Sequence, residues 1–88
     1  MPTPPPDALV EAISREHIAS LARLYDRFVH ALDPFSAESD QAERAFHQEI
    51  ANLYDLLTLP KPEFRVFQKA VILRCRRHLR ASDKPGSF

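Results

Sequence analysis

Residues 62–80, PEFRVFQKAVILRCRRHLR, decide the fold expected of this 88-residue chain. The stretch opens with a proline, a residue that favours the first turn of a helix. It then continues for about five turns with no glycine and no further proline. The sequence therefore predicts a long helix over residues 62–80.

This helix carries apolar residues on two sides when its positions are placed at about 100° per residue. One face contains Phe64, Phe67, Val71, Cys75 and His78, with Ile72 and Leu79 on its flank, and close to the opposite side lie Val66, Ala70 and Leu73. A surface helix of a small monomer normally needs one apolar face. Either this is the most central helix of the monomer, or its second face is buried against a partner.

Two further helices are expected upstream, at about residues 8–32 and 40–57. The first has an apolar stripe formed by Val10, Ile18, Leu21, Tyr25, Phe28 and Leu32. Asp7 is the expected N-cap, Asp33-Pro34 is the expected stop, and Ser14 on the stripe is a place where the helix could break. We expect one helix there.

The second of these helices has an inner face formed by Ala42, Phe46, Ile50, Leu53 and Leu57, widened by Tyr54 and Leu56. Ser36, Ser39 and Asp40 compete as its N-cap, and Asp40 with Glu43 makes a variant of the capping box. Pro60 and Pro62 forbid a continuous helix into residues 62–80. The predicted fold is an all-α three-helix bundle, completed by homodimerisation.

The expected domain covers residues 7–81, between a flexible proline-rich leader at 1–6 and a flexible tail at 82–88. A single domain of this size is marginally stable without a staple or a partner. The single cysteine excludes an intramolecular disulfide and makes a reducing, cytoplasmic setting the expectation. With no export signal and no stretch near the roughly 20 apolar residues that span a bilayer, no membrane association is expected.

Charge is unevenly distributed although the net charge is zero. Residues 1–60 hold four arginines against ten acids, whereas residues 61–88 hold eight cations against two acids. Four of the cations, Arg65, Lys69, Arg76 and Arg80, form a basic stripe along one side of the helix at 62–80. The stripe could follow a phosphate backbone or could be a solvated or acid-paired face.

The residues that usually carry catalysis are sparse. One glycine excludes a phosphate-binding loop, and the histidines lack the spacing of a zinc or di-iron site. Cys75 with His78 could form a reactive thiol, but a free cysteine within an apolar stripe is more often a small buried hydrophobe. We therefore expect no catalytic residue, no metal, no cofactor and no small-molecule substrate.

The function expected is helix-mediated protein–protein association, as a homodimer or with another helical protein. The interface candidates are Phe28, Leu32, Val66, Phe67, Ala70 and Leu73. The alternative is nucleic-acid binding through the basic stripe.

Overall fold

The computed structural model describes residues 4–82 and contains four α-helices. They are α1 (Pro6–Glu11), α2 (Arg15–Val29), α3 (Ala37–Asp55) and α4 (Phe64–Ser82). No strand occurs in this part of the chain, so the all-α prediction is confirmed. The prediction of three helices is wrong, because the region 8–32 forms two.

The break between α1 and α2 occurs at Ser14. Its backbone is extended (φ −61°, ψ 148°), and its Oγ accepts a hydrogen bond from the His17 N–H at 3.1 Å. A serine in this geometry satisfies an amide of the following helix that otherwise lacks a partner. This local bond favours the start of a new helix over one continuous helix. The periodicity of the apolar residues does not reveal such a bond.

The end of α2 lies three residues before the predicted boundary. The chain leaves the helix at His30, whose amide donates to the Asp26 carbonyl at 3.0 Å. Leu32 is therefore beyond the helix and fully exposed, not part of the inner stripe. Leu56 follows α3 in the same way and is also exposed.

Ser36, not Asp40, is the N-cap of α3. Its Oγ accepts a hydrogen bond from the Ser39 amide at 3.1 Å, and the helix starts three residues earlier than predicted. Asp7, predicted as the cap of the first helix, lies inside the first turn of α1, and Pro5 occupies the cap position without a side-chain bond.

The start of α4 is also shifted, from Pro62 to Phe64. The Pro62 carbonyl accepts a hydrogen bond from the Tyr54 hydroxyl, not from an amide of the helix. The first carbonyl that accepts from amides of α4 is that of Glu63, which is 3.1 Å from both the Val66 and the Phe67 nitrogen. Nearby, Lys61 places its ammonium 4.5 Å from the centre of the Tyr54 ring. Tyr54 thus fixes the connector that leads from α3 into α4.

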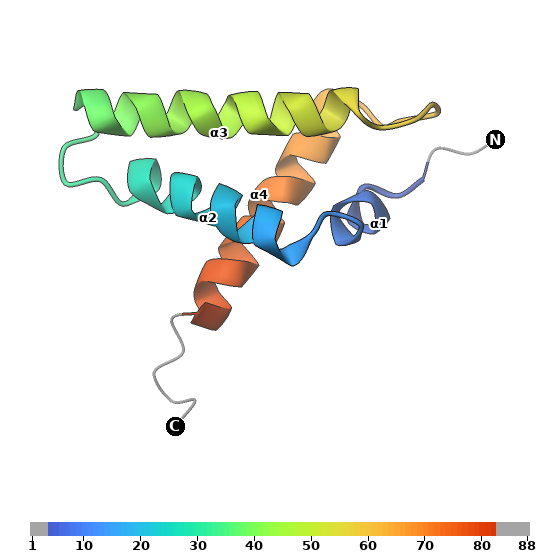
Figure 1. Cartoon of the computed structure of the whole chain (residues 1–88), viewed down its shortest axis with the longest axis horizontal. Helices are drawn as coiled ribbons and strands as arrows, with labels where there is room; N and C mark the ends of the chain where they lie inside the picture. The colour runs from blue at the N-terminus through green and yellow to red at the C-terminus, as the bar shows by residue number, and fades with distance from the viewer. Residues whose placement is uncertain (1–3, 83–88) are drawn as a thin grey trace.

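Figure 1 shows α2 and α3 lying side by side, with α4 passing behind α2 and crossing the pair. α2 contacts both α3 and α4 extensively, α1 packs on α4, and α3 meets α4 over a small area. The fully buried side chains come from all three long helices: Ile18, Leu21, Ala22, Phe46, Ile50, Phe67, Val71 and Cys75. The core therefore lies where α4 crosses the α2–α3 pair.

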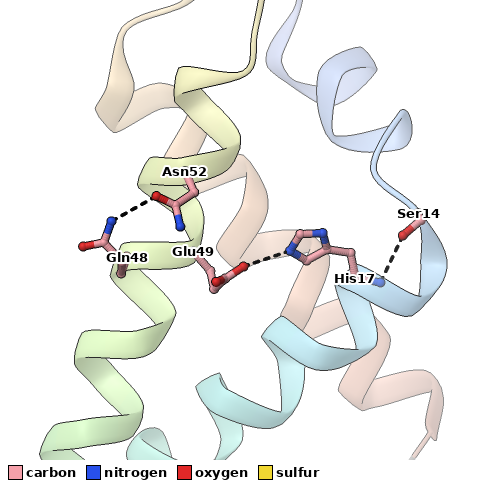
Figure 2. A network of polar contacts seen from close by, with 5 residues as sticks. All are labelled: Ser14, His17, Gln48, Glu49 and Asn52. Atoms are coloured by element: carbon pink, nitrogen blue, oxygen red, sulfur yellow. Dashed lines mark hydrogen bonds and ion pairs between the residues drawn. The ribbon is translucent and has the colours of Figure 1, made fainter.

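An aromatic cluster fills the α2–α3 contact. The rings of Tyr25, Phe28 and Phe46 are mutually 5.5–5.6 Å apart between centroids. At the side of this contact, Figure 2 shows His17 of α2 directed at Glu49 of α3, with Nε2 and Oε2 3.2 Å apart. Both side chains are partly exposed, so this pair contributes little to stability beyond orienting the two helices.

Parts of the predicted flexible ends lie outside the described residues, namely 1–3 of the leader and 83–88 of the tail. Of the remaining leader residues, Pro6 is the first residue of α1. The helical region at the other end reaches Ser82, two residues beyond the predicted end at Arg80.

Candidate functional site

The inner face of α4 is complete within one chain. Phe67, Val71 and Cys75 are fully buried in the core, and Phe64 and Ile72 pack against it. Burial raises the pKa of the Cys75 thiol from 9.0 to about 11, an effect that the nearby Arg74 guanidinium only partly offsets. A protonated, buried thiol is a poor nucleophile, so Cys75 acts as a core residue.

The outer face of α4 is different in composition. It consists of the side chains that point away from the core: Arg65, Val66, Lys69, Leu73, Arg76, Arg77 and Arg80, all of them exposed. Val66 and Leu73 keep 45% and 49% of their surface accessible, although both are apolar. Two half-exposed apolar side chains, two turns apart, thus lie among five cations.

The cations of this outer face have no acidic partner among the described residues. The ion pairs found in residues 4–82 join His17 to Glu49, His30 to Asp26 and Arg44 to Asp40, and none involves α4. Between Phe64 and Ser82 the sequence contains no acid. The basic stripe of Arg65, Lys69, Arg76 and Arg80 is therefore a solvent-facing surface of the monomer.

A second apolar surface lies where α2 turns into α3, at the left of Figure 1. Leu32 and Phe35 in this turn are almost entirely exposed, and Val29 at the end of α2 is half-exposed. Beside them an open groove of about 830 Å³ separates the end of α2 from the start of α3. We call it the α2–α3 groove; Leu24, Ala31, Ala42 and Ala45 form its apolar part.

Charged side chains surround the apolar part of the α2–α3 groove. Asp33 and Glu38 contribute carboxylates to its lining, and Arg27 contributes a guanidinium. Gln41 adds an exposed amide on α3, one turn after Glu38. The lining of the groove thus combines apolar side chains with a charged set that is, on balance, acidic.

The six predicted interface residues do not form one surface. Phe67 is fully buried and Ala70 nearly so, and Phe28 is half-buried in the aromatic cluster, so these three are core residues of the monomer. Val66 and Leu73 are exposed on the outer face of α4, whereas Leu32 lies in the α2–α3 turn. Two separate surfaces remain as candidates for binding a partner.

Three of the histidines contact another polar side chain, His30 close by in the sequence and His17 and His47 on another helix. His30 Nδ1 lies 2.7 Å from Asp26 Oδ1, as their spacing of four residues on one helix suggests. His47 bonds to the amide nitrogen of Gln68 on α4 at 3.1 Å. No cluster of three or more His, Cys, Asp or Glu suited to a metal ion exists within residues 4–82.

Comparison with known proteins gives no relative for this chain: no family model, no curated protein and no solved structure matches it. Among the helices of residues 4–82, none combines the length and the hydropathy that crossing a membrane requires. The surfaces themselves are therefore the basis for a functional proposal.

Sequence reasoning missed the α2–α3 groove together with Val29 and Phe35. A groove forms where two helices are separated in space, and the apolar periodicity of each helix does not encode that separation. Phe35 did leave a signal, because an aromatic residue directly after Asp33-Pro34 lies in a turn and cannot belong to either helix's inner face.

Proposed function

We propose that this protein acts non-enzymatically, through helix-mediated association, and that it forms a homodimer through the outer face of α4. One observation carries the proposal: Val66 and Leu73 remain half-exposed although Phe67, Val71 and Cys75 on the inner face of the same helix are already fully buried. Apolar surface left in water favours association, by roughly 25 cal/mol for each Å² removed. A small domain also gains stability from a second copy.

The surrounding cations fit such an interface. Interfaces bury apolar anchors at their centre and place charged side chains at the rim, where they select the partner and raise the association rate. Val66 and Leu73 are the anchors in this proposal, and Lys69, Arg76 and Arg80 are the rim. A cytoplasmic location belongs to the proposal too, because the single cysteine offers no intramolecular disulfide.

The test is the mass in solution of the full chain and of Leu73→Asp, measured by light scattering over a range of concentrations. The wild type is expected at twice the chain mass of 10.1 kDa, and Leu73→Asp at the chain mass itself. Leu59→Asp is the control, since Leu59 is the same residue type and even more exposed (82% against 49%) but lies in the α3–α4 connector. A monomeric wild type at all concentrations would contradict the homodimer.

Nucleic-acid binding is the second candidate, supported by the exposure of all four basic-stripe residues without described acidic partners. Neutralising phosphates releases counterions, so the logarithm of the binding constant should fall with the logarithm of salt concentration, with a slope of about −3 to −4 for four contacts on duplex DNA. Fluorescence anisotropy with a labelled duplex measures this slope.

In that experiment, Lys69→Gln with Arg76→Gln is expected to reduce the slope by about two. Arg15→Gln with Arg23→Gln is the matched control, because both arginines are exposed but lie on α2 and are not part of the basic stripe. Absence of any binding to DNA or RNA at low salt would exclude this function.

A further inference from the structure

The proposed homodimer needs a surface that receives the outer face of α4. We infer that the outer face of α4 from one copy binds in the α2–α3 groove of another copy, with Val66 and Leu73 inserted between the two helices. This inference rests on the proposed homodimer and names the surface that receives α4. It differs from the simplest dimer, in which α4 would pack on its own symmetry mate.

Packing of α4 on a second α4 is opposed by charge. The outer face carries five cations and no acid, so two such faces in contact would juxtapose like charges across a desolvated interface. The partner surface must therefore be apolar at its centre and acidic at its edge.

The α2–α3 groove has this character. Its apolar lining includes Leu24, Ala42 and Ala45, and its charged lining holds two carboxylates, from Asp33 and Glu38, against the one guanidinium of Arg27. α3 as a whole carries five acids, Glu38, Asp40, Glu43, Glu49 and Asp55, and a single cation, Arg44. Of these acids, Glu38 lines the groove itself, whereas Asp40 and Glu43 line a different hollow on α3.

The dimensions also agree. Val66 and Leu73 are seven residues apart, an axial rise of about 10.5 Å. The α3 side of the groove extends from Glu38 to Ala45, also seven residues and therefore the same rise. The groove volume of about 830 Å³ lies within the range of clefts that enclose whole ligands, so it is large enough for the side chains of Val66 and Leu73.

The face and the groove lie on different elements, so a closed dimer needs a two-fold axis that brings each against its counterpart on the other copy, which makes the whole interface isologous. Two copies related by a two-fold axis would make the contact twice and close as a dimer. The outer face of α4 in each copy would then lie in the groove of the other copy. The fully exposed Leu32 at the groove would lie next to that helix.

A charge-exchange experiment tests this arrangement. The groove variant, Glu38→Arg with Gln41→Arg, places two cations opposite the basic face. The face variant, Lys69→Glu with Arg80→Glu, places two acids opposite the acidic groove. Each variant alone is expected to associate at least about tenfold more weakly than wild type. A 1:1 mixture should recover the dimer, because each variant supplies the surface complementary to the other.

Asn52→Arg with Asp55→Arg is the matched control, since it makes the same change in charge at the opposite end of α3 (Figure 1). This control should dimerise as wild type does. Far-UV circular dichroism of each variant verifies that the helices are intact.

The outcomes separate the two proposals. If Leu73→Asp abolishes the dimer while the groove variant leaves it intact, the homodimer stands and the groove is the wrong partner surface. If the groove variant and the face variant are each monomeric and their 1:1 mixture stays monomeric, the inference is also overturned. A monomeric wild type removes the inference and the proposed function together.

A second measurement covers the case in which a charge variant fails to fold. Ala45→Cys and Leu73→Cys both alter exposed positions, while the native Cys75 stays buried. Oxidation of a mixture of the two single variants should give a disulfide-linked heterodimer. Leu59→Cys mixed with Ala45→Cys should give none, and equal cross-linking in the two mixtures would overturn the inference.

Discussion

The two faces of α4 show how differently one helix can use its apolar residues. On the inner face, Phe67, Val71 and Cys75 are covered completely by the other helices. On the outer face, Val66 and Leu73 keep about half of their surface, and Ala70 between the two faces is almost covered. Apolar residues on both sides of a helix therefore do not make it the centre of a monomer. What decides burial is whether a neighbouring helix reaches that side.

The largest effect is expected from breaking the inner face. Phe67→Ala should lower the free energy of unfolding by about 3–5 kcal/mol, because it removes a fully buried ring and leaves a cavity between α4 and its neighbours. Urea titration followed by circular dichroism measures the loss. Phe35→Ala, at an almost fully exposed ring, should change it by less than about 0.5 kcal/mol. Equal losses would contradict the placement of the core.

A second test uses the buried thiol of the inner face. The pKa of Cys75 is raised from 9.0 to about 11, so the folded chain retains this proton at a pH where the unfolded chain releases it. Stability from this group is thus present below pH 9 and is lost as the pH rises towards 11, by about 2–3 kcal/mol. The free energy of unfolding of wild type and of Cys75→Ala, measured by urea titration between pH 9 and 11, isolates the effect. Cys75→Ala should lose less of it over this pH range.

A third substitution locates the border between the faces. Ala70→Leu adds three carbon atoms at a nearly buried position and should cost about 1–3 kcal/mol by overpacking. The same change at the exposed Ala81 near the end of α4 should be close to neutral. If Ala70→Leu were also neutral in thermal denaturation, Ala70 would belong to the outer face.

The smallest effect is expected on the outer face itself. Leu73→Ser, measured on dilute protein that is monomeric, should change the free energy of unfolding by less than about 0.5 kcal/mol. At higher concentrations the wild type should gain thermal stability through dimer formation, whereas Leu73→Ser should not. A large loss in the dilute monomer would show that Leu73 stabilises a single chain.

Much of the fold could be predicted from periodicity. The buried apolar residues of α3, Ala42, Phe46 and Ile50, match the predicted stripe, and so do Phe67, Val71 and Cys75 of α4. Of the predicted interface residues, Val66 and Leu73 are exposed, whereas Phe67 and Ala70 are buried. Sequence spacing fixes the angular position of a residue on its helix. Whether its side chain is buried depends on which other helix packs against that side.

The helix ends were predicted less well, because they depend on individual hydrogen bonds. The Ser14 and Ser36 hydroxyls each start a helix by accepting an amide three residues ahead, and Tyr54 holds the Pro62 carbonyl just before α4 begins. Several nearby residues could have made equivalent bonds. Competing caps of similar energy are not separated by sequence reasoning.

The sequence by itself determined that this chain is helical, that each long helix has an apolar inner face, and that one outer face is rich in cations. These properties follow from local spacing and composition. Only the tertiary structure decided that α2 stops before Leu32, that Ala70 is covered while Leu73 is not, and that a groove opens between α2 and α3. The physical reason is that solvent exposure results from contacts between helices distant in sequence, and no single helix specifies them.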